Sequence, residues 1–121
     1  MQLQPHHRTA LLYFGFALAA AAFVLSLLPL GLKSALHTTG SLHPLFHLAL
    51  FFTLGVLAWV STTQGRVRLL LLAGAVLLGL SIEYSEKVRF QIALEVYDIV
   101  TDTCGVALGA VAGWLLDRKA G

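Results

Sequence analysis

The stretch VYDIVTDTCGVALGAVAGWLL, residues 96–116, places two aspartates and three glycines in an otherwise apolar run. Asp98, Asp102, Gly105, Gly109 and Gly113 follow one another at spacings of four, three, four and four residues, so a helix would carry all five on one face. Glycines at such spacings let helix backbones approach closely where lipid provides no hydrophobic driving force. The stretch therefore predicts a membrane helix that packs through its glycines and carries two acids near its start.

The composition of the whole chain also indicates a membrane protein. Of its 121 residues, 58% are apolar and 12% are charged, whereas globular domains are roughly half apolar and a quarter charged. A water-soluble fold of this size could not bury so much apolar surface. The net charge is +2, and the Lys and Arg residues stand singly or in pairs beside apolar runs, which argues against a nucleic-acid partner.

Four runs are long enough to cross a bilayer, for which about 20 mostly apolar residues are needed. They predict an all-α fold, a four-helix transmembrane bundle, as a single domain over residues 1–121. We expect its helices at about 9–30, 44–63, 67–86 and 96–116. The first run is longer than the core of a secretory signal and therefore predicts a retained helix.

The strictly apolar parts of the last two helices are short. Residues 69–82 and 103–116 are 14 residues each, which is about 21 Å of helix against about 30 Å of hydrocarbon. For the same reason, the second helix must include the residues around His43 and His47 at its start. Completing each span draws ionisable residues into the helix ends: His43, His47, Glu83, Glu86, Asp98 and Asp102. Ionisable residues at membrane depth mark functional sites by default or face one another inside the bundle.

The basic residues favour an orientation with both termini in the cytoplasm, where Lys and Arg are enriched. Five of them fall on the side of the termini and three on the other: Arg8, Arg66, Arg68, Arg118 and Lys119 against Lys33, Lys87 and Arg89. The start of the second helix, the end of the third and the start of the fourth then share the outer face. We therefore expect the six ionisable residues to form one layer there.

His43 and His47 stand one helical turn apart, which permits two interpretations. A His-x-x-x-His pair on a helix can present both imidazoles to one metal ion. Alternatively, the histidines hydrogen-bond to carboxylates of the same layer. The second interpretation is preferred because, apart from His37 in a predicted loop, no further histidine lies near another candidate segment on the side of His43 and His47. No metal and no other cofactor is therefore assigned.

Residues 84–97 mix charged and apolar side chains and predict a short interfacial helix or loop on the outer surface. Within this segment, Lys87 and Glu95 are assigned to a solvated connection. Glu83 adjoins the apolar run, one turn after Gly79, and is the better candidate for a carboxylate that faces the interior.

These residues resemble the VanZ-like family of small membrane proteins. That family shows a histidine with an aromatic residue four positions on, which His47 and Phe51 match, and a glutamate at the end of the next helix, which Glu83 matches. Its last helix carries an aspartate, an asparagine four residues later, and glycines three and seven residues beyond. The matching positions here are Asp98, Asp102, Gly105 and Gly109. The resemblance covers about residues 44–113.

The chain departs from the family pattern at several positions. Glu86 stands where the family has a glutamine, Asp102 where it has an asparagine, and Pro44 where a lysine is frequent. The family usually has an arginine between the glutamate and the aspartate, and that position falls near Ile92. Arg89 is the nearest replacement.

The resemblance implies a protein of the bacterial inner membrane that acts in the cell envelope. The family is named for a protein associated with resistance to the glycopeptide teicoplanin. We expect a site at the outer face that binds or acts on an envelope lipid or small molecule, in a bundle surrounded by membrane lipids. Whether the protein is an enzyme stays open, because the sequence shows no nucleophile motif and no phosphate-binding loop.

In this interpretation His47 is the acid, base or hydrogen-bond donor, Glu83 and Asp98 are its carboxylate partners, and Asp102 supports them. These four are the predicted catalytic residues. Binding roles are predicted for His43, Glu86 and Arg89, and helix packing for Gly105, Gly109 and Gly113.

Two other functions also fit the pattern. One is a proton- or ion-coupled carrier, which with four helices would have to act as a homodimer. The other is a structural assembly subunit whose polar layer fixes the helix register.

Overall fold

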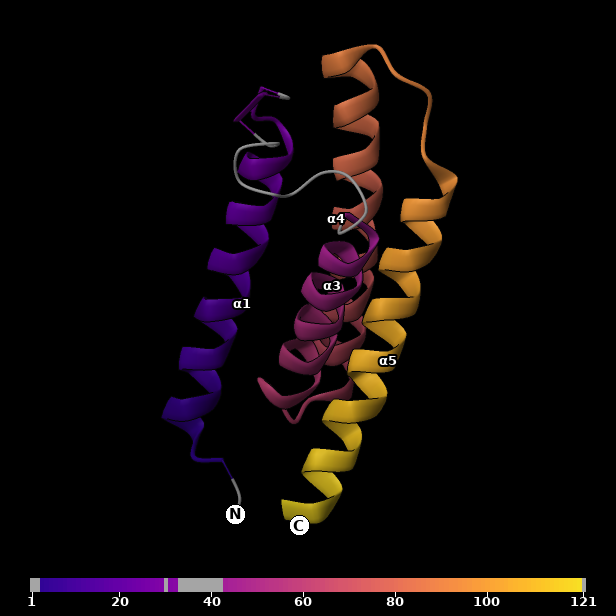
Figure 1. Ribbon diagram of the computed structural model, residues 1–121. Coiled ribbons are helices and arrows are strands. Elements are labelled where there is room, and N and C mark those ends of the chain that lie inside the picture. The colour runs from indigo at the N-terminus through magenta and orange to yellow at the C-terminus, as the bar shows by residue number, and fades with distance from the viewer. Residues whose placement is uncertain (1–2, 30, 33–42, 121) are drawn as a thin grey trace.

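The computed structural model describes residues 3–29, 31–32 and 43–120, and the long helices in these residues form a bundle (Figure 1). The helices are α1 (Pro5–Ser26), α3 (His43–Val60), α4 (Gly65–Phe90) and α5 (Val96–Ala120). Each of the four is long and apolar enough to cross a membrane. The predicted all-α, four-helix transmembrane bundle is therefore confirmed. Lys33, His37 and the predicted end of the first helix at residue 30 lie outside the described residues.

The helix α1 begins and ends four residues before its predicted bounds. Pro5 opens the helix, where its missing N–H is no loss and its fixed φ suits the first turn, so the chain up to Arg8 is helical. Pro29 disfavours a helical conformation of the residue before it, Leu28. The helix accordingly ends at Ser26, whose Oγ donates a 2.6 Å hydrogen bond to the carbonyl oxygen of Phe23.

The helix α4 is longer than predicted and takes up most of the expected interfacial segment. Residues 84–90 continue the helix, so only residues 91–95 connect α4 to α5. Lys87 and Arg89 in the last turn suit the negative end of the helix dipole. Gln91, with φ of 53°, ends the helix in the left-handed conformation. The end of α4 therefore rises beyond the starts of α3 and α5 (Figure 1).

The closest contact in the bundle joins α3 to α5. At its centre Gly55 of α3 faces Gly109 of α5, and neither position has room for a side chain. A Cβ atom on Gly109 would collide with the carbonyl oxygen of Phe52, and one on Gly55 would collide with the carbonyl oxygen of Val106. The two backbones therefore touch directly, as is typical of small-residue contacts in membranes.

Gly105 and Gly113 extend this contact by one turn in each direction. A Cβ atom on Gly105 would lie 3.1 Å from the Cβ of Phe51, and one on Gly113 would lie 2.6 Å from the Cβ of Trp59. All three glycines that were predicted to pack helices thus lie against α3.

At the end of the bundle that holds both termini, polar contacts join all four helices. Arg8 of α1 and Arg68 of α4 donate hydrogen bonds of 2.7 and 2.9 Å to the carbonyl oxygens of Val60 and Trp59, which are at the C-terminal end of α3. Such carbonyls have no partner within their own helix. Arg68 also donates a 2.6 Å hydrogen bond to Asp117 of α5. The helix α3 thus ends at Val60, three residues before its predicted end, and α5 continues past residue 116 to Ala120.

The apolar core is small and lies between α3, α4 and α5. Its buried members are Phe51, Leu54, Ala75, Ile82 and Val106. The helix α1 packs less closely, and an apolar cavity of about 430 Å³ separates part of it from α3 and α4. The functional groups are therefore to be sought among the other three helices.

Gly109→Ala is expected to destabilise the bundle by about 1–3 kcal/mol, because the added methyl group forces apart backbones that are in contact. Gly74→Ala on α4 is the matched control, since a Cβ atom there would meet nothing within 4 Å. Thermal unfolding of both variants in detergent micelles measures the difference. Equal stability of the two variants would contradict the proposed role of the contact.

Candidate functional site

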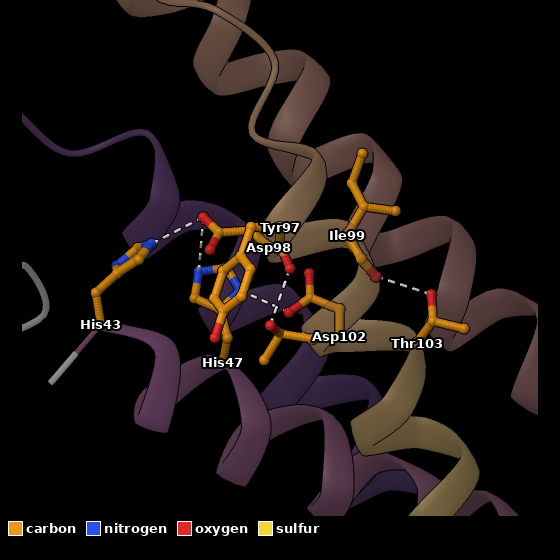
Figure 2. Close-up of polar contacts among 8 residues, drawn as sticks. His43, His47, Tyr97, Asp98, Ile99, Asp102 and Thr103 are labelled. Atoms are coloured by element: carbon orange, nitrogen blue, oxygen red, sulfur yellow. Dashed lines mark hydrogen bonds and ion pairs between the residues drawn. The ribbon is translucent and has the colours of Figure 1, made fainter.

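Two histidines of α3 face two aspartates of α5 (Figure 2). His47 Nδ1 lies 2.6 Å from Asp102 Oδ1, and His43 Nε2 lies 3.0 Å from Asp98 Oδ2. The other ring nitrogen of His47, Nε2, lies 4.0 Å from the same Asp98 oxygen. The two histidines are one helical turn apart, and so are the two aspartates. Each histidine therefore meets one aspartate, and His47 lies between Asp98 and Asp102.

Both aspartates are buried, with 2% of Asp98 and 1% of Asp102 exposed. Asp98 lies in the first turn of α5, where the positive end of the helix dipole favours a negative charge. Asp102 lies deeper, about 9 Å along the helix axis from Val96. Its carboxylate fits against α4 only because Gly79 has no side chain, since a Cβ atom there would lie 2.9 Å from Asp102 Oδ2.

The buried carboxylate of Glu83 brings α4 into the site. One ligand atom each of His47, Glu83 and Asp102 lie within 4.8 Å of one another, and so do carboxylate oxygens of Glu83, Glu95 and Asp98. Glu83 Oε1 and Asp102 Oδ2 are buried and have no hydrogen-bond partner within the described part of the chain. Buried oxygens are nearly always hydrogen-bonded, so two exceptions at one place need a physical explanation.

We call these residues the polar cluster: His43, His47, Glu83, Glu95, Asp98 and Asp102. The structure thus brings together the four predicted catalytic residues and His43, as the short apolar runs of the helices predicted. The ring of Phe51 stacks on that of His47, with centroids 6.3 Å apart and an angle of 18° between the planes. Phe51 is fully buried and restrains the orientation of the imidazole.

Glu95 lies exposed in the connection between α4 and α5, as the sequence interpretation expected, and its carboxylate also belongs to the polar cluster. Its carbonyl oxygen accepts the backbone hydrogen bonds of Asp98 and Ile99, which places Glu95 at the N-terminal cap of α5. A hydrogen bond with the Asp98 side chain raises the pKa of Glu95, and partial burial adds to this effect. Glu95 therefore keeps its proton to a higher pH than an ordinary glutamate. Glu95 stands three residues before Asp98, which is the spacing between a cap residue and the first turn of a helix. This spacing is the sequence signal that could have predicted their contact.

The two remaining predicted binding residues, both on α4, have different positions. Glu86 is buried, with 7% exposed, one turn beyond Glu83. Arg89 is exposed on the last turn, and its guanidinium carbon lies 5.4 Å from the centre of the Phe90 ring. It stands about 9 Å of helix beyond Glu83, because α4 continues to Phe90. The structure therefore does not place Arg89 in the polar cluster.

The arrangement supports two kinds of chemistry. The carboxylate of Asp102 holds His47 by Nδ1, which leaves Nε2 directed toward Asp98. A histidine oriented in this way can transfer protons as a general acid or base. The same nitrogen and oxygen atoms are also of the types that bind transition metals.

Comparison of the chain with protein-family models, with curated proteins and with solved structures finds no match.

Asp102→Ala is expected to lower the free energy of unfolding by about 1–3 kcal/mol, because it leaves the Nδ1 atom of His47 buried without its partner. Asp102→Asn retains an oxygen that can accept a hydrogen bond and should cost less than about 1 kcal/mol. Thermal unfolding in detergent micelles compares these variants with Thr103→Ala. Thr103 is the control because its side chain is exposed and its hydroxyl donates a hydrogen bond to the carbonyl oxygen of Ile99 within the same helix.

A loss of stability in Asp102→Asn as large as that in Asp102→Ala would count against this explanation. It would show that the negative charge of Asp102, rather than its hydrogen bond, stabilises the bundle.

Proposed function

We propose that the chain is a VanZ-like protein of the bacterial inner membrane whose polar cluster binds or acts on an envelope lipid or small molecule. The main support is the buried His47–Asp102 pair, which faces Asp98 and Glu83 inside an apolar bundle. Buried ionisable groups are costly at membrane depth. Glycine packing already brings α3 and α5 into direct contact, so close helix packing does not by itself require these groups.

Within the site, His47 is the group that gives or takes a proton. Asp102 fixes the ring through Nδ1, so Nε2 is the atom that faces the ligand. Asp98 and Glu83 lie close enough to stabilise a positive charge on the ring while it carries the extra proton. The ligand must therefore have an oxygen or nitrogen atom that gains or loses a proton, as in hydrolysis or group transfer.

The ligand reaches the cluster from the side of His43. The His43 side chain is 27% exposed, against 11% for His47 and 3% for Asp98. A polar headgroup at this position would contact His43 first and then the buried groups. Its acyl chains would lie along the exposed apolar surface of α3 and α5, where Leu45 and Val100 are more than half exposed.

We place the polar cluster at the outer leaflet. It lies at the end of the bundle opposite both termini (Figure 1). The basic residues Arg66, Arg68, Arg118 and Lys119 all lie near the end that holds the termini, which is the pattern of a cytoplasmic face.

Reporter fusions test this orientation. A reporter that is active only in the cytoplasm should be active after Gln64, in the turn between α3 and α4, and after Gly121. The same reporter inserted after Ile92, between α4 and α5, should be inactive. Activity after Ile92 combined with inactivity at the other two positions would reverse the assigned sides.

Asp98→Asn should abolish the function and Asp102→Asn should largely preserve it. An amide has the shape of a carboxylate but carries no charge and accepts no proton at neutral pH. At position 102 the amide oxygen can still accept the hydrogen bond of His47, and the resembling family has asparagine there. The measurement is the teicoplanin susceptibility of a sensitive Gram-positive host that expresses each form at equal membrane yield.

Wild-type protein and Asp102→Asn should lower the susceptibility of the host to teicoplanin, and Asp98→Asn should not. If both variants lose stability in detergent to the same degree and neither loses function separately, a structural role of the polar cluster is favoured instead.

A further inference from the structure

We propose that the polar cluster is a binding site for one divalent transition-metal ion such as Zn²⁺, held by His43, His47 and Asp98 and oriented by Asp102. This inference goes beyond the proposed function and does not depend on it, because metal binding can be measured without any lipid ligand. It also differs from the sequence interpretation, which assigned the two histidines to hydrogen bonds with carboxylates alone.

The donor atoms have a suitable spacing. One ring nitrogen each of His43 and His47 and one oxygen of Asp98 lie within 4.8 Å of one another. The two Nε2 atoms lie 3.0 and 4.0 Å from Asp98 Oδ2. Ligands bound at about 2.0–2.1 Å around a tetrahedral zinc ion lie roughly 3.3 Å apart. His47 Nε2 would have to approach Asp98 Oδ2 by about 0.7 Å from its 4.0 Å separation to reach that distance.

The structure contains the hydrogen bond that would orient His47 as a metal ligand. A histidine that binds a metal through one nitrogen usually donates its other N–H to a carboxylate, which fixes the ring and makes the ligand more basic. The 2.6 Å contact between His47 Nδ1 and Asp102 Oδ1 supplies this interaction and leaves Nε2 for the metal. A second set of donors, His47 with Glu83 and Asp102, would have to use the Asp102 carboxylate as a ligand. The set with His43 and Asp98 keeps that hydrogen bond and is therefore preferred.

The unpaired buried oxygens are an independent indication of a cation. Glu83 Oε1 and Asp102 Oδ2 have no hydrogen-bond partner among the described residues, and both residues are at least 98% buried. Asp98 and Asp102 form their ion pairs with imidazoles, which carry charge only when protonated. A divalent ion at this place would offset the negative charge of several carboxylates at once.

The types of donor select the metal. Two imidazole nitrogens and one carboxylate oxygen suit zinc and its first-row neighbours, whereas Mg²⁺ and Ca²⁺ prefer oxygen ligands throughout. Three protein ligands would leave a position open, as in catalytic zinc sites. Carboxylate oxygens of Glu83 lie within 4.8 Å of ligand atoms of His47 and of Asp98, so Glu83 stands next to this set of donors.

The test uses the full chain without a histidine tag, purified in detergent and freed of metal with a chelator. Titration with Co²⁺ should give one bound ion per chain with the intense visible absorption of a tetrahedral complex, and Zn²⁺ should displace it. His47→Gln and Asp98→Asn should abolish this absorption. Asp102→Asn should keep one ion per chain with affinity about 10- to 100-fold lower, because it changes only the support of His47.

The matched control removes the other neighbouring histidine pair of the chain. The rings of His6 and His7 have centroids 4.1 Å apart at the start of α1, at the opposite end of the bundle. The double variant His6→Gln/His7→Gln should bind Co²⁺ as the wild type does. Circular dichroism shows whether each variant folds, and if His47→Gln does not, the more exposed His43→Gln takes its place.

Three results would overturn the proposal. The first is a folded wild-type protein that forms no stoichiometric Co²⁺ complex. The second is binding that persists in folded variants lacking His47 or Asp98. The third is binding that disappears when only His6 and His7 are replaced.

Discussion

The rest of the structure depends on the direct backbone contact between α3 and α5. Gly55 and Gly109 leave no room for side chains between the two helices, so their separation and their register are fixed at this point. Two turns nearer the start of each helix, the same register brings His47 opposite Asp102. The chemistry of the polar cluster is therefore a consequence of glycine packing in the middle of the bundle.

Polar contacts then secure the two ends of the bundle in different ways. Helices in a membrane gain little from hiding apolar surface from one another, because lipid is equally apolar. At one end Arg8, Arg68 and Asp117 join all four helices through charged hydrogen bonds and the last carbonyls of α3. At the other end the groups are carboxylates and imidazoles, and two carboxylate oxygens have no hydrogen-bond partner among the residues that the structure describes. The first arrangement pairs the charges of Arg8, Arg68 and Asp117, and the buried atoms without a described partner there, Trp59 Nε1 and Ser61 Oγ, are neutral. The second leaves carboxylate oxygens without a described partner, and we propose the function there.

The sequence predicted the bundle and most of the site because both follow from length. Fourteen apolar residues cannot cross a bilayer, so Glu83 and Asp98 had to lie within helices at the same end. The extent of α4 could not be predicted, because mixed polarity fits an interfacial segment as well as a helix that continues beyond its neighbours. Arg89 therefore lies beyond the polar cluster, and its binding role stays a prediction. The contacts of Asp117 depend on how the end of α5 meets other helices, which spacing along one chain does not determine.

The central claim is that His47 is held inside the bundle by Asp102 and presents Nε2 to a ligand. Nitrogen-15 NMR of histidine-labelled protein in lipid bilayers measures this directly, with His47→Gln identifying the signal. We expect one His47 tautomer with the proton on Nδ1, slow exchange of that proton with water, and a changed Nδ1 shift in Asp102→Ala. A His47 ring that averages both tautomers, exchanges rapidly with water and does not respond to Asp102→Ala would contradict the account.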